Sequence, residues 1–264
     1  MSCQGAPSQS RSQSGQAAVE SAIVLPLFVF LILGILQLGL MHQARLLTKY
    51  AAYKAVRAGS LHNARVEKME RAALAVLLPL LSARAPGGIE YIRPVGSAKE
   101  FQTKWNEVLQ NQMPGTSLKY ADVTICGPTR EDIPGNGSEL DFDDPANTAP
   151  GDWRQSQRTK LRVQVTFNYR MFIPFADWVI YQSARGRELP AVLRMRNKAG
   201  DFGPARKLGG KTGESPYEEA AGKGIYVMPI RATYIMRMQS NFFLNSAALP
   251  ERNECVFPFS YENP

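Results

Sequence analysis

The sequence predicts an α+β fold, in which a long N-terminal transmembrane and stalk helix is followed by helices packed on a small antiparallel sheet. Three observations lead to this prediction. Residues 21–41 form an uncharged apolar run, the residues after it keep an apolar pattern at helical spacing, and two later segments alternate apolar with polar residues as strands do. A chain of 264 residues is long enough to bury a core.

The apolar run reads SAIVLPLFVFLILGILQLGLM. Its length matches the roughly 20 residues that a helix needs to cross the hydrocarbon core of a membrane. Pro26, Gly34 and Gly39 interrupt it, and both residue types are more frequent in membrane helices than in soluble ones. The run also exceeds the apolar core of a signal peptide. We therefore expect a transmembrane helix over residues 21–41.

The residues before this helix have a different character. Residues 1–15 read MSCQGAPSQSRSQSG, a polar stretch in which Arg11 is the only charged side chain, and such a stretch cannot bury apolar surface. Glu20 then stands at the head of the membrane helix, where desolvation of a carboxylate begins. One interpretation is that the carboxylate lies among headgroups and favours the helix N-terminus.

The segment GQAAVESAIVLPLFVFLILGILQLG resembles the N-terminal signature of TadE-like proteins, the pseudopilins of tight-adherence (Flp) pilus systems. In that signature a prepilin peptidase cuts after a Gly, and a Glu stands at the fifth mature position. Gly15 matches the cut site, Gln16 the first mature residue and Glu20 the fifth. Val24, Leu25 and Pro26 match the V-L-P step of the signature, and the resemblance extends over residues 14–58.

The resemblance implies three parts: a cleaved leader at residues 1–15, a transmembrane and stalk helix at residues 16–60, and a pilin-like periplasmic α+β domain at residues 61–264. It implies a minor pilin or pseudopilin that takes part in assembly or initiation of a Tad/Flp-type pilus through helix–helix packing. Glu20 and Pro26 would be assembly residues, and cleavage would leave an amino group close to Glu20. The alternative is a membrane-anchored periplasmic binding module unrelated to pili.

The resemblance also implies the partners and the location. The partners would be other pilins or pseudopilins, the inner-membrane assembly platform, the prepilin peptidase and the lipid bilayer. The chain would cross the inner membrane once, with its N-terminus cytoplasmic and its C-terminal domain periplasmic, and its entry into the pilus stays open. Arg45, Lys49 and Lys54 follow the membrane helix, and the positive-inside rule alone places such residues in the cytoplasm. We give the leader pattern precedence, because long domains translocate largely regardless of charge.

The composition argues against catalysis and cofactors. The chain has two histidines, and its three cysteines show no metal-binding or redox spacing, so we expect no catalytic residues, no metal, no cofactor and no enzymatic activity. The net charge is +8, but the basic residues are spread along the chain and interleaved with acidic ones. We therefore expect no nucleic-acid partner. In a periplasmic domain Cys126 and Cys255 can form a disulfide; two buried free thiols are the alternative.

The remaining elements follow from periodicity. The apolar pattern of the stalk continues to about Ala58. Asn63 is a candidate cap for a second helix, which ends before Arg84. A third helix is expected at residues 98–112. Strands are expected around residues 123–125, at residues 161–171 with one buried and one wet face, and at residues 226–238, where Pro229 favours either a late start of the strand or an edge position. Residues 127–156 and 185–222 are expected to be long exposed loops, and whether they bind anything stays open.

Overall fold

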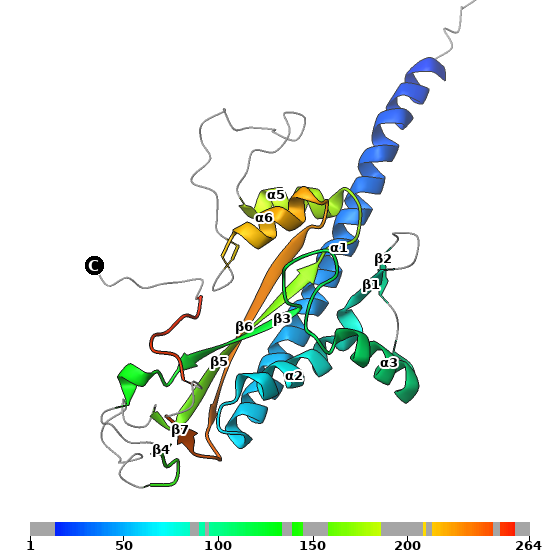
Figure 1. The fold of residues 1–264 in the computed structure, drawn as a ribbon. Helices are drawn as coiled ribbons and strands as arrows, with labels where there is room; N and C mark the ends of the chain where they lie inside the picture. The colour runs from blue at the N-terminus through cyan, green and yellow to red at the C-terminus, as the bar shows by residue number, and fades with distance from the viewer. Residues whose placement is uncertain are drawn as a thin grey trace, which may run out of the picture.

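The computed structural model describes residues 14–84, 90–92, 95–133, 139–144, 158–185, 208–209, 213–244 and 249–256. Its elements confirm the predicted α+β class: a long N-terminal helix is followed by shorter helices and small antiparallel sheets (Figure 1). In chain order they are α1 (Ser14–Leu61), α2 (Val66–Leu77), η1 (Leu78–Leu80), β1 (Ser82–Arg84), β2 (Glu90–Ile92), α3 (Ala98–Val108), β3 (Ala121–Gly127), η2 (Arg130–Asp132), β4 (Glu139–Leu140), β5 (Lys160–Arg170), α5 (Ala176–Arg185), α6 (Ser215–Gly222), β6 (Val227–Arg237) and β7 (Phe242–Phe243).

The central sheet has three strands in the order β3-β5-β6, and both pairs are antiparallel. The C-terminal part of α1 packs on β5 and β6, while α2 packs on α1 and β3, so the two helices cover one face of the sheet. The N-terminal part of α1 projects out of the domain (Figure 1). β6 is an edge strand in which Pro229 lies opposite Asn168, which agrees with the edge position that its missing N–H favours.

The start of α2 differs from the prediction. Asn63 has a positive φ of 55° and lies in the turn after α1, and Arg65 precedes the helix instead. The Asn63 backbone N–H donates to Ser240 Oγ (2.9 Å), and its side-chain amide donates to the carbonyl of Asn241 (2.7 Å). Asn63 therefore ties the α1–α2 turn to the segment after β6 and does not cap α2.

The third helix is shorter than predicted, and it ends at Val108 where residues 98–112 were expected. Its start is fixed by a capping box, in which Ser97 Oγ accepts from the Glu100 backbone N–H while the Glu100 carboxylate accepts from the Ser97 N–H. The segment predicted as a loop at residues 185–222 ends in a helix, α6.

The prediction of a wet second face on β5 was wrong. Leu161, Val163 and Val165 are buried on the α1 side as expected, but Gln164 and Asn168 on the other side are buried too. The C-terminal segment covers Gln164, whose side-chain amide pairs with both backbone groups of Val256 (2.7 and 2.9 Å). Tyr217 of α6 covers Asn168. Alternation therefore located the strand correctly but not the polar contacts on its second face.

Candidate assembly site on the N-terminal helix

The first part of α1 is largely exposed. From Ala18 to Leu36 no described side chain is buried, although most of them are large and apolar. Among the described residues this is the one helix that is long and apolar enough to cross a membrane. A helix with an apolar surface on every side belongs in an apolar surrounding, so the exposed part of α1 is compatible with a single-pass membrane anchor.

The residues predicted for processing and assembly lie at the start of this helix. The backbone of Gly15 and Gln16 is already helical, because α1 begins at Ser14, and their side chains lie outside the described set. Glu20 is exposed and follows Gln16 by four residues, one helical turn. Pro26 lies inside α1, where it cannot donate to the carbonyl of Ala22. α1 therefore brings the backbone nitrogen of Gln16 and the Glu20 carboxylate to the same side of one turn.

An apolar stripe continues along α1 beyond the expected membrane segment. Ile35, Leu38, Leu46 and Tyr50 are each about half exposed or more. Together with the exposed His42, they recur at intervals of three or four residues and so lie along one side of the helix. Leu46 and Tyr50 are placed after residue 41, so lipid contact alone does not account for their exposure. We call Ile35, Leu38, His42, Leu46 and Tyr50 the outer stripe.

The face of α1 toward the sheet consists mainly of small side chains. Ala44, Thr48, Ala51 and Ala55 are fully buried there. Gly59 makes the closest approach, since a Cβ at this position would lie 2.5 Å from Met69 Sδ and 2.7 Å from Leu161 Cδ2. Small residues let α1 lie close to α2 and the sheet, while the larger apolar residues of the outer stripe remain outside.

A buried amide marks the point where α1 leaves the domain. Gln37 is fully buried, and its Oε1 accepts a hydrogen bond from the backbone N–H of Ile173, just before α5 (3.3 Å). The phenol of Tyr169 on β5 lies beside Gln37, and burial raises its pKa. Sequence reasoning did not assign Gln37 a role. The signal was present, because Gln37 is the one amide side chain in the run of residues 21–41 and such residues usually face protein.

The two cysteines of the C-terminal domain form a disulfide. Cys126 of β3 and Cys255 form a disulfide with a Cα–Cα distance of 5.4 Å. The bond holds the C-terminal segment against the sheet, beside the pairing of Gln164 with Val256. Of the C-terminal aromatic residues, Phe242 is buried in the domain's own core and Phe243 is exposed, while Phe257 and Phe259 lie outside the described residues.

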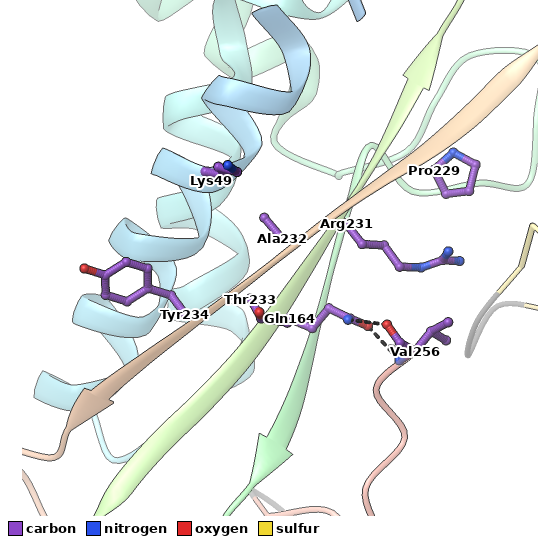
Figure 2. Close-up of a pocket in the computed structure, with 8 residues that line it drawn as sticks. All are labelled: Lys49, Gln164, Pro229, Arg231, Ala232, Thr233, Tyr234 and Val256. Carbon is purple, nitrogen blue, oxygen red and sulfur yellow. Dashed lines mark hydrogen bonds between the residues drawn. The ribbon is translucent and has the colours of Figure 1, made fainter. Parts of the chain in front are cut away.

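A cavity of about 600 Å³ lies along β6. Figure 2 shows Lys49 of α1 and Arg231 of β6 on opposite sides of this strand, with Gln164 paired to Val256 beside it. Burial lowers the pKa of the Arg231 guanidinium, which donates a hydrogen bond to the carbonyl of Leu208. The described lining residues are Lys49, Gln164, Pro229, Arg231, Ala232, Thr233, Tyr234 and Val256. Among the described residues no three His, Cys, Asp or Glu side chains come together as metal ligands would.

Comparison with known proteins assigns the N-terminal helix. Residues 15–57 match the model of the family described as TadE-like protein. This match confirms the resemblance read from the sequence, and it covers the anchor, the outer stripe and most of the face buried against the sheet. No curated protein and no solved structure matches the chain.

Proposed function

From the TadE-like match of residues 15–57, which associates this helix with the Tad pilus, we propose that the protein is a minor pilin or pseudopilin. It takes part in assembly or initiation of a Tad/Flp-type pilus through helix–helix packing. The observation that supports this role best is the outer stripe, because it continues apolar surface from the membrane segment into the part of α1 beside the domain. Apolar residues at this spacing are what a neighbouring helix needs for packing.

The proposed location is the inner membrane, with the N-terminus cytoplasmic and the C-terminal domain periplasmic. The Cys126–Cys255 disulfide supports this orientation, because disulfides persist in the periplasm and are rare in the cytosol. The partners are other pilins or pseudopilins, the inner-membrane assembly platform, the prepilin peptidase and the lipid bilayer. We propose that the protein acts by packing, without catalysis, a cofactor or a nucleic acid.

Processing between Gly15 and Gln16 gives Glu20 its role. Cleavage frees an α-amino group four residues before the carboxylate, and in a stack of helices the Glu20 of one subunit meets the amino terminus of its neighbour. A carboxylate in an apolar surrounding is costly unless it is paired. The pair therefore fixes the axial position of one helix against the next, and Glu20 acts through register and charge neutralisation.

The outer stripe is tested by Leu46→Ser, with Leu109→Ser as a matched control, since both leucines are about half exposed and Leu109 lies after α3. Losing the burial of one leucine weakens an interface by about 2 kcal/mol, roughly 30-fold in affinity. We expect Leu46→Ser to reduce pili on cells and co-purification with other pilins, and Leu109→Ser to change neither. Membrane abundance and the disulfide serve as controls for folding. Normal piliation with Leu46→Ser would contradict the proposal.

The cavity along β6 favours a second candidate, a membrane-anchored periplasmic binding module unrelated to pili. Lys49 and Arg231 line this cavity from opposite sides of β6, so an anionic ligand would contact one of these two cationic groups at a time. This candidate does not need processing, so retention of residues 1–15 in the purified protein, together with normal piliation in a deletion strain, would support it over the pilin role.

A further inference from the structure

The turn before α5 lies at the level of the membrane segment. The hydrogen bond from the Ile173 backbone N–H to Gln37 Oε1 joins this turn to α1, and Gln37 belongs to the apolar run of residues 21–41. Figure 1 shows α5 at the end of the domain from which the N-terminal part of α1 projects. The domain therefore contacts α1 inside the predicted span and not only beyond it.

The helical rise sets the depth of this contact. Gln37 follows Glu20 by 17 residues, which is about 26 Å along the axis of an α-helix. The hydrocarbon core of a bilayer is about 30 Å thick. When Glu20 lies at the cytoplasmic boundary, Gln37 and the turn bonded to it lie near the periplasmic boundary, a few Å inside the hydrocarbon edge.

The side chains of the turn suit that depth. Phe175 is 71% exposed and has a φ of +66°, a backbone conformation that residues other than Gly seldom adopt. Pro174 is also exposed, and Phe172, Ile173 and Trp178 are half-buried. Trp is enriched at membrane–water interfaces, and Phe and Leu are typical of apolar surfaces that lie at the boundary between headgroups and acyl chains. An exposed Phe in a strained turn is unfavourable in water and favourable at a lipid surface.

Asp177 is the one ionisable residue from Phe172 to Ile180. Its Oδ1 accepts from the backbone N–H of Trp178 (2.6 Å), and burial raises the pKa of its carboxyl. The carboxylate is thus half-buried and bonded to the first turn of α5. Tyr226 lies on the inner side of α5 against Tyr181, with ring centroids 5.3 Å apart.

We propose that residues 172–178 form a membrane foot, which seats in the headgroup and upper acyl region of the periplasmic leaflet. This inference rests on the proposed function in one respect, the crossing of the membrane by α1 with Glu20 at the cytoplasmic side. The occupant of the exposed turn is the lipid surface, because the turn is continuous with the anchor and reaches lipid depth. The foot fixes the height and tilt of the domain before the helix enters an assembly.

The test places a single Trp in the full chain, in nanodiscs of phosphatidylcholine that carries no bromine, bromine on the upper acyl chain, or bromine near the acyl-chain end. Trp105, Trp153 and Trp178 are replaced by Phe, and Phe175→Trp is compared with Phe243→Trp, whose native side chain is 41% exposed on β7. Leu31→Trp, 55% exposed in the middle of the anchor, reports whether α1 is inserted. We expect upper-chain bromine to quench Phe175→Trp, bromine near the chain end to quench Leu31→Trp, and Phe243→Trp to keep its emission in both lipids.

Two outcomes would overturn the foot while leaving the anchor intact. In the first, Leu31→Trp is quenched by brominated lipid and Phe175→Trp is not. In the second, Phe175→Trp is shielded from both brominated lipid and aqueous iodide, which indicates a contact with another protein chain. Quenching of neither would refute the membrane anchor itself. If the Trp-free chain does not form the Cys126–Cys255 disulfide, the difference in quenching between wild type and Trp178→Phe provides the same test.

Discussion

At the residue scale, buried polar side chains join elements that are distant in the sequence. Asn168 of β5 accepts a hydrogen bond from the Tyr217 hydroxyl of α6 (2.6 Å) and donates one to the carbonyl of Lys119 (2.7 Å). Arg185 at the end of α5 donates to the Tyr181 hydroxyl (3.1 Å) and to the Glu218 carboxylate of α6 (2.6 Å). These bonds hold α5 and α6 at the end of the sheet from which the anchor emerges.

Tyr217→Phe tests this network. Burial raises the pKa of the Tyr217 phenol to about 12, from the ordinary tyrosine value of 10.0. Between these two values the unfolded chain has lost the phenol proton while the folded chain keeps it, so rising pH favours unfolding. The stabilising contribution of the protonated phenol is fully present below pH 10, and a few kcal/mol of it are lost as the pH rises through about 12.

We expect Tyr217→Phe to lower the free energy of unfolding by about 1–2 kcal/mol at neutral pH, because Asn168 Oδ1 loses its donor. We also expect this substitution to remove the part of the stability loss at alkaline pH that comes from titration of Tyr217. The measurement is denaturant unfolding of the full chain in detergent at pH 8 and pH 11. Tyr234→Phe, at an exposed position on β6, is the control. An unchanged difference between the two pH values in Tyr217→Phe would refute this assignment.

At the element scale, the position of α1 on the sheet depends on small residues at the contact. The Cβ of any residue replacing Gly59 would collide with Met69 and Leu161, whereas a Cβ at Gly34 would have no described atom within 4 Å. Gly34 lies on the projecting part of α1, outside the domain.

Gly59→Leu is therefore expected to force α2 and β5 away from α1 and to destabilise the domain by about 1–3 kcal/mol. Gly34→Leu is the matched helix variant, and we expect it to leave the melting temperature of the domain unchanged. Thermal unfolding in detergent, followed by the far-UV signal of the sheet, measures both. A Gly59→Leu melting temperature equal to that of wild type would show that α1 is not packed against Met69 and Leu161.

The elements that the sequence predicted are those with strong periodicity. The long apolar run of residues 21–41 predicted α1, and the strict alternation at residues 161–171 predicted β5. Each pattern is compatible with few types of secondary structure. α6 was not predicted, because Gly213 and Pro216 mark a turn locally while the helix is stabilised by buried Tyr217 and Ala220. The burial of Gln164 depends on Val256, 92 residues away, and no local pattern contains that contact.

At the scale of the whole molecule, the disulfide closes a long loop. Cys126 and Cys255 are 129 residues apart, and the bond ties the C-terminal segment to β3 over the second face of the sheet. A cross-link over such a length restricts the unfolded chain strongly, with typical contributions of about 2–4 kcal/mol.

Replacing both cysteines by Ser is expected to lower the free energy of unfolding by about 2–4 kcal/mol and to expose the C-terminal segment to proteases. Figure 1 shows the described part of this segment away from the projecting part of α1, so membrane association should persist. Denaturant unfolding and limited proteolysis, with and without reductant, measure both effects on the full chain. Equal unfolding of the two forms would show that the bond adds nothing to stability.

The anchor, the outer stripe and the proposed membrane foot are all compatible with α1 crossing a membrane, and the proposed function puts the domain on the periplasmic side. The positive charges of Arg45, Lys49 and Lys54 oppose this orientation, whereas the disulfide agrees with it. The processing of the N-terminus distinguishes a pilin precursor from an ordinary anchored domain, because the pairing proposed for Glu20 requires a free amino group at Gln16.

The most direct measurement is therefore the N-terminus of the protein purified from its native membrane, by intact mass and sequencing, with and without the prepilin peptidase. A chain that begins at Gln16, and that keeps residues 1–15 when the peptidase is deleted, is the predicted result. A chain that begins at Met1 or Ser2 in both strains would contradict the pilin role, because Glu20 would then have no neighbouring amine to pair with.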